Sequence, residues 1–204
     1  MAYKKSYSRK YSSKRIVVKP KIPWSLARKS GSMEVHGPKK NGSWPSNKLV
    51  TTYANTTLIQ ATTDGSYTAG PTRKVKHLRI EITRSFTVDN EKLHQALVKM
   101  KAYIVFLPQG VDFSTTNESG SHLSTTLVNH PEWILAEKTL NCNYKSDSST
   151  VSNQTINCKL SKNLRSGDGL YLIVATTYNT NRCDDDMSGH ILPVNIEYQY
   201  AITP

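Results

Sequence analysis

Residues 191–202 read ILPVNIEYQYAI, and every second side chain from Leu192 onward is apolar. Side chains of a β-strand alternate between its two faces, so this spacing places the apolar set on one face. The apolar set is Leu192, Val194, Ile196, Tyr198, Tyr200 and Ile202, with Asn195, Glu197 and Gln199 between its members. The stretch therefore predicts a strand with one buried face and one solvated face.

The same period of two recurs upstream. Leu78, Ile80 and Ile82 share one predicted face, opposite His77, Arg79 and Glu81. Residues 170–177 (LYLIVATT) are apolar on both faces, which predicts a central strand. The other predicted strands are Leu49–Thr63, Lys74–Thr83, Leu97–Leu107, 133–142 and 151–160. Within 97–107 the expected apolar row is Val98, Met100, Ala102, Ile104 and Phe106, with Lys99 and Lys101 opposite.

Helical signals are few. A short helix is expected over Glu91–Ala96, after a possible cap at Asp89, and a single turn over 129–132 before Trp133. Seven or eight strands with long loops and no βαβ rhythm predict an all-β protein. We expect an antiparallel, single jelly-roll β-sandwich.

The composition agrees with this class. Of 204 residues, 43 are Ser or Thr, and Tyr (11) outnumbers Phe (3) and Trp (3), a mixture that favours strands. No apolar run approaches the roughly 18–20 residues that span a bilayer, so no membrane insertion is expected. Met1–Lys5 begins no secretory signal. The odd set Cys142, Cys158 and Cys183 predicts reduced thiols in an intracellular setting.

Charge divides the chain in two. Residues 1–40 hold 12 Lys or Arg and one acid, a net charge of +11, whereas the whole protein carries +12. A basic segment with few apolar residues cannot offset its ordering entropy by burial. We therefore expect residues 1–40 to be a largely disordered, nucleic-acid-binding arm and linker, followed by a jelly-roll domain over 41–204.

Tyrosines lie between the basic clusters of this arm. Phenol rings can stack on the free bases of a single strand while Lys and Arg follow its phosphates. A solubility tail or a nuclear-import signal is the alternative interpretation. The candidate nucleic-acid-binding residues are Lys4, Lys5, Tyr7, Arg9, Lys10, Tyr11, Lys14, Arg15, Lys19 and Lys21. Lys74, Lys76 and Lys99 or Lys101 are further candidates in the folded body.

Catalytic and metal motifs are absent from the sequence. The six histidines lack HExxH or HxH spacing, and the chain has no GxSxG, P-loop or GxGxxG pattern. Residues 166–169 (SGDG) are expected to form a turn between strands rather than a phosphate cradle. Asp184, Asp185 and Asp186 could hold Ca²⁺, with a solvated loop as the alternative. We expect no enzyme, no cofactor and no resident metal.

Three stretches in the body carry a resemblance. They are Tyr103–Gly110 (YIVFLPQG), His130–Ala136 (HPEWILA) and Lys159–Asp168 (KLSKNLRSGD). In this order, and behind a basic arm, the set resembles capsid proteins of circular, Rep-encoding single-stranded DNA viruses, the circovirus-like group. The arm here shares its charge between Lys and Arg and adds Tyr, whereas circovirus arms are dominated by Arg.

The resemblance implies a virion protein in a T=1 icosahedral shell of about sixty identical copies. Its arms would carry on the order of 660 positive charges toward a single-stranded DNA genome. A host nuclear import receptor and assembly in the nucleus are also implied. A satellite-type RNA virus coat and a cellular single-strand-binding module remain as alternatives. Apolar loop residues expected at subunit interfaces are Trp44, Phe113, Leu123, Leu127 and Met187.

Overall fold

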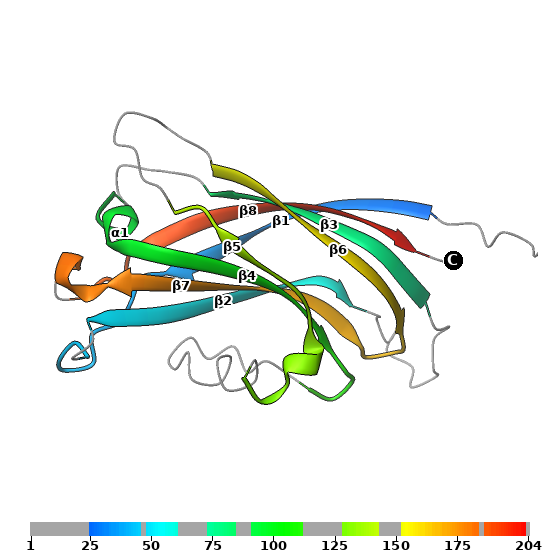
Figure 1. Ribbon diagram of the computed structural model, residues 1–204, viewed down its shortest axis with the longest axis horizontal. Coiled ribbons are helices and arrows are strands. Elements are labelled where there is room, and N and C mark those ends of the chain that lie inside the picture. The colour runs from blue at the N-terminus through cyan, green and yellow to red at the C-terminus, as the bar shows by residue number, and fades with distance from the viewer. Residues whose placement is uncertain are drawn as a thin grey trace, which may run out of the picture.

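The computed structural model describes residues 25–45, 48–60, 73–84, 91–111, 128–142, 152–183 and 186–202. Over these residues the chain forms two β-sheets that pack face to face, with one short helix at an end (Figure 1). The strands are β1 (Ser25–His36), β2 (Leu49–Gln60), β3 (Arg73–Arg84), β4 (Leu97–Leu107), β5 (Ile134–Leu140), β6 (Ser152–Leu164), β7 (Gly169–Asn179) and β8 (Ile191–Ile202). The helix is α1 (Glu91–Ala96), and 3-10 turns span η2 (Pro131–Trp133) and η3 (Thr180–Arg182).

The strand order defines the fold. The first sheet runs β1-β8-β3-β6 and the second runs β2-β7-β4-β5. All neighbouring pairs in both sheets are antiparallel. Two four-stranded sheets whose strands alternate between them in this way form a jelly roll, which confirms the expected fold class.

The core lies between the two sheets, on the faces that the period of two predicts. Leu192, Val194 and Ile196 are buried on β8, which spans the expected residues and lies between β1 and β3. Residues 170–177 belong to β7, which lies between β2 and β4 as a central strand. Helix α1 also has the expected bounds, and Pro131–Trp133 form the turn expected near Trp133.

Strand β1 corrects the expected domain boundary. It pairs along its whole length with β8, although it lies within the range 1–40 that we assigned to the arm and linker. The sequence of β1 does not show the apolar alternation of a half-buried strand. Its first half is charged, and β1 buries only Met33 and Val35 among its apolar side chains. The sheets therefore begin at Ser25 rather than at residue 41.

Two expected side-chain positions are wrong. Val98 is 52% exposed instead of lying in the apolar row with Met100, because the β4–β7 register shifts between Leu97 and Lys99. Met187, expected at a subunit interface, is fully buried in the main core. Its backbone pairs with Pro38 and His190, which holds the segment before β8 against the β1–β2 connection.

The turn between β6 and β7 joins two of the stretches that carry the family resemblance. The buried Asp168 carboxylate accepts hydrogen bonds from the backbone N–H of Gln109 at 3.0 Å and of Arg165 at 2.8 Å. Gly167 has φ +86°, and a Cβ there would lie 2.5 Å from the Gln109 side chain. The PQG and SGD residues thus form one structural joint, which confirms the expected turn.

Replacing Asp168 by Ala should destabilise the subunit by about 3 kcal/mol, because two buried N–H groups lose a charged acceptor. Urea denaturation of the soluble subunit measures this loss. Asp168→Asn keeps one carbonyl oxygen and should lose about half as much. A loss below about 1 kcal/mol for Asp168→Ala would show that the joint contributes little.

Tyr178 makes the stability of the subunit fall at alkaline pH. Burial raises the pKa of its phenol to about 12. The unfolded phenol ionises near pH 10, so stability is full below about pH 10 and falls between about pH 10 and 12. The loss at pH 12 should be about 2–3 kcal/mol. Urea denaturation from pH 8 to 12 should show a smaller alkaline loss for Tyr178→Phe, and equal losses would contradict this assignment.

Candidate nucleic-acid interface

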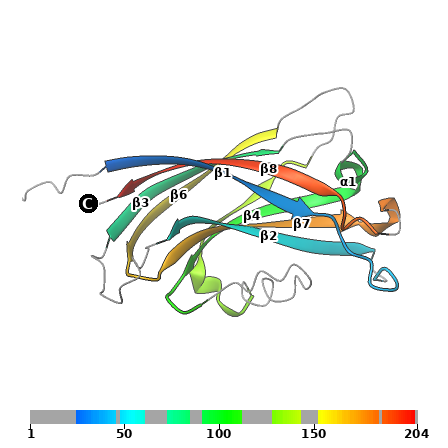
Figure 2. The ribbon, with the colours of Figure 1, turned by 180° about the vertical axis from the view of Figure 1, so that it is seen from behind.

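The arm residues predicted to bind nucleic acid lie outside the described residues. The arm is bonded to Ser25, so its attachment point is the start of β1. Ser25 is paired with Ile202, and both views show the start of β1 beside the chain's C-terminal end (Figures 1 and 2). The arm therefore joins the sandwich at one end of the first sheet.

This end of the first sheet is cationic. The four strand segments there are 25–30, 73–79, 157–165 and 197–202, and together they contain nine Lys or Arg and one acid, Glu197. Strand pairing brings these segments side by side. The sequence shows the excess charge of the arm, but only the pairing shows that the arm enters beside further cations.

A bulge in β3 increases the number of basic side chains on the outer face. His77 has φ +54°, and the pairing of β3 shifts register there with both neighbours. Val75 and Leu78 are buried, so the residues between them both face outward. Lys74, Lys76, His77 and Arg79 consequently share the outer face, which strict alternation would prevent.

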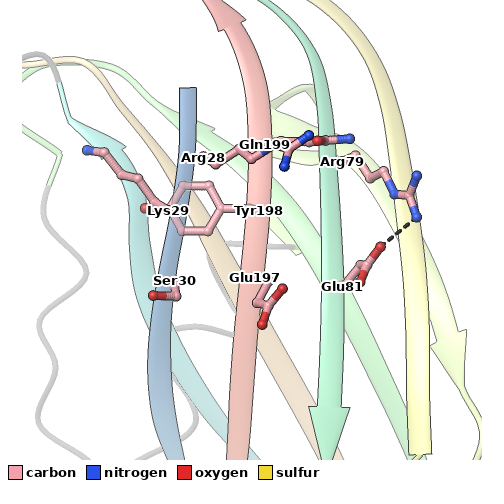
Figure 3. Close-up of a pocket in the computed structure, with 8 residues that line it drawn as sticks. All are labelled: Arg28, Lys29, Ser30, Arg79, Glu81, Glu197, Tyr198 and Gln199. Carbon is pink, nitrogen blue, oxygen red and sulfur yellow. Dashed lines mark hydrogen bonds and ion pairs between the residues drawn. The ribbon is translucent and has the colours of Figure 1, made fainter. Parts of the chain in front are cut away.

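A pocket of about 480 Å³ lies over the outer face of β1, β8 and β3. Arg28, Gln199 and Arg79 are directly paired across the three strands and form one row (Figure 3). The next row contains Ser30, Glu197 and Glu81. The pocket is lined by both rows together with Lys29 and Tyr198.

The two rows differ in charge and in their existing partners. Arg79 donates to Glu81 at 2.5 Å, and both side chains are partly exposed. Neither Arg28 nor Glu197 has an ion pair with any residue in the described ranges. Tyr198 turns away from the outer face, and its hydroxyl donates to the Leu58 carbonyl at 2.6 Å. The row with the arginines can bind anions, and the neighbouring row can accept hydrogen bonds.

The four lysines predicted in the body separate into two groups. Lys74 and Lys76 lie on the outer face of the first sheet, near the arm. Lys99 and Lys101 lie on β4 in the second sheet, opposite the buried Met100 and Ala102. Lys101 is 3.7 Å from Glu137 and 5.8 Å from the Tyr103 ring centre. The two groups of lysines therefore lie on different sheets.

The other candidate residues have structural surroundings. Asp184 and Asp185 lie outside the described residues, and exposed Asp186 accepts from the Ser188 backbone N–H at 2.9 Å, which lowers its pKa. His94 is buried in α1. All three cysteines are free thiols. Among the described residues, no three His, Cys, Asp or Glu side chains gather into a possible metal site.

The helices within the described ranges are all too short or too polar to cross a membrane.

No protein-family model and no curated protein matches the chain. Among solved structures, it is similar to a chain of infectious bursal disease virus Gt strain, with 10% identity and a TM-score of 0.31. That match covers 92% of this chain and 35% of the viral chain. A chain of Desmodium yellow mottle tymovirus matches at 11% identity and a TM-score of 0.28, covering 98% and 93%. Both likenesses are distant, and the strand order of the chain itself defines its jelly-roll fold.

Proposed function

We propose that this chain is a structural coat protein that assembles into a small icosahedral shell around a single-stranded DNA genome. The observation that carries the proposal is the attachment of a basic arm to the cationic end of a jelly roll. Viral capsid domains are one of the principal uses of this architecture, along with lectins and cupins. A long basic arm distinguishes the first use, because it provides charge for packaged phosphates.

The arm and the first sheet are proposed to act on the same partner. Each Lys or Arg that neutralises a phosphate releases a counterion, so affinity grows with the number of contacts and falls with salt. The arm residues proposed to make these contacts are Lys4, Lys5, Tyr7, Arg9, Lys10, Tyr11, Lys14, Arg15, Lys19 and Lys21. The described cations beside Ser25 continue this charge onto the folded body.

The shell is proposed to contain about sixty copies in T=1 symmetry, with the arms directed inward. The protein acts structurally and needs no enzymatic step or cofactor in this role. It is a virion component, and recognition of the basic arm by a host import receptor would bring it to the nucleus for assembly.

The nucleic acid inside purified particles tests the proposal. We expect nuclease-protected material that becomes sensitive to DNase, but not RNase, once the particles are opened. Protected RNA would instead indicate the coat of an RNA virus. Monomers that bind single strands without forming particles would indicate a cellular binding module.

A further inference from the structure

The pocket over β1, β8 and β3 is a further binding site in the folded body. We propose that it holds one nucleotide of the packaged single strand, with the phosphate at Arg28 and Arg79 and the base edge at Glu197. The inference rests on the proposed function for the identity of the partner. Its volume of about 480 Å³ is in the range of small-ligand pockets.

The arginine row supplies the phosphate end. Arg28 and Arg79 lie on either side of Gln199, two strand spacings apart, so their Cα atoms are separated by about 10 Å. A guanidinium has five N–H donors, and the bond from Arg79 to Glu81 leaves others for an anion. The Gln199 amide can donate between the two arginines. Figure 3 shows the Arg79 guanidinium directed toward Glu81 rather than toward Gln199, so binding of one phosphate by the whole row requires Arg79 to rotate toward β8.

The neighbouring row supplies the base end. Glu81 already accepts from Arg79, whereas Glu197 has no hydrogen-bond partner among the described residues. A carboxylate accepts from the amino group of cytosine. Thymine offers a single N–H between two carbonyl oxygens, which repel a carboxylate. Glu197 therefore favours cytosine over thymine in this pocket.

The pocket lies close to the point where the arm joins β1, so a nucleic acid bound to the arm can reach it. Arg28 is three residues beyond Ser25, where the arm joins β1. The bulge at His77 adds Lys76 and His77 to the same outer face, between the pocket and the end of the sheet. A single-stranded nucleic acid bound to the arm can thus continue along these cations into the pocket.

The salt dependence of binding tests the phosphate end. Full-length protein carrying Arg28→Gln and Arg79→Gln is titrated with fluorescent (dC)₂₀ from 50 to 300 mM salt, beside unaltered protein. The control variant, Lys48→Gln with Lys92→Gln, removes two exposed charges, one just before β2 and one in α1. Loss of two phosphate contacts should make the slope of log affinity against log salt shallower by about 1.4 in the pocket variant only.

Three results would each overturn one of the claims made above. Equal slopes for the pocket and control variants overturn the nucleotide site. An arginine variant that binds DNA normally but cannot assemble would make the pocket a subunit interface instead. Absence of binding by unaltered protein overturns the proposed function itself, which is a distinguishable failure.

Base preference tests the carboxylate end. Unaltered protein should bind (dC)₂₀ about 2- to 10-fold more tightly than (dT)₂₀, as expected for one added hydrogen bond. Glu197→Gln should tighten (dT)₂₀ binding, because a negative charge is lost, and should bring the ratio close to one. Titrations with dCMP and inorganic phosphate separate a strand site from a free-nucleotide or phosphate site. An unchanged ratio in Glu197→Gln, or equal occupancy by phosphate alone, would contradict the assignment.

Discussion

Neutralising the eight arm cations should weaken binding of single-stranded DNA by at least about 1,000-fold at physiological salt, because eight phosphate contacts are lost together. The variant replaces Lys4, Lys5, Arg9, Lys10, Lys14, Arg15, Lys19 and Lys21 by Gln. On single strands each contact contributes about 0.7 to the salt slope, so the slope should fall by about 5–6. Fluorescence anisotropy at several salt concentrations measures both quantities.

A charge-conserving control isolates the cause of this loss. Exchanging Lys for Arg and Arg for Lys at the same eight positions keeps the arm's charge and should keep most of the affinity. The melting temperature of the subunit should be unchanged in both variants, since β1 begins only at Ser25. An arm that binds DNA equally well after neutralisation would contradict its proposed role.

Placing aspartates at Leu49 and Val98 should abolish particle formation while the subunit stays folded. Leu49 is 43% exposed and Val98 is 52% exposed. Both lie at the same end of the second sheet, because the neighbouring residues Asn179 and Tyr178 of β7 pair with Leu49 and Leu97. A closed shell buries apolar groups of this kind between copies, and a charge there would be desolvated without a partner.

The matched control places aspartates at exposed Thr57 and Thr139, in the same sheet. Sedimentation velocity should show particles for this control and only slow species for Leu49→Asp with Val98→Asp. The free energy of unfolding of dissociated subunits, measured by urea denaturation, should differ between the two variants by about 0.5 kcal/mol or less, as for surface substitutions generally. Particles of normal size in the Leu49 and Val98 variant would show that this end is not an interface.

The fold was largely predictable because most strands bury one face. The alternation in residues 191–202 and the apolar run at 170–177 define β8 and β7, one central strand in each sheet. Strand β1 was missed because it is an edge strand with a charged first half, so backbone pairing with β8 rather than burial positions most of it. Val98 was misplaced because a register shift changes the phase of alternation inside a strand.

Only the positive charge of the candidate site could be predicted from the sequence. Composition identifies the basic arm, whose residues lie outside the described ranges and whose role stays a prediction. The pocket depends on the pairing of Arg28 with Gln199 and of Gln199 with Arg79, which are far apart along the chain. The bulge at His77 similarly turns Lys74 and Lys76 to the face that carries Arg79. No short stretch of sequence reveals these strand pairings or the bulge.

Electron microscopy of the full-length protein mixed with single-stranded DNA tests the central claim most directly. The proposed coat function predicts uniform, closed particles built from about sixty subunits, with density for nucleic acid inside the shell. Subunits that remain monomeric, or that form only irregular aggregates with the DNA, would contradict it.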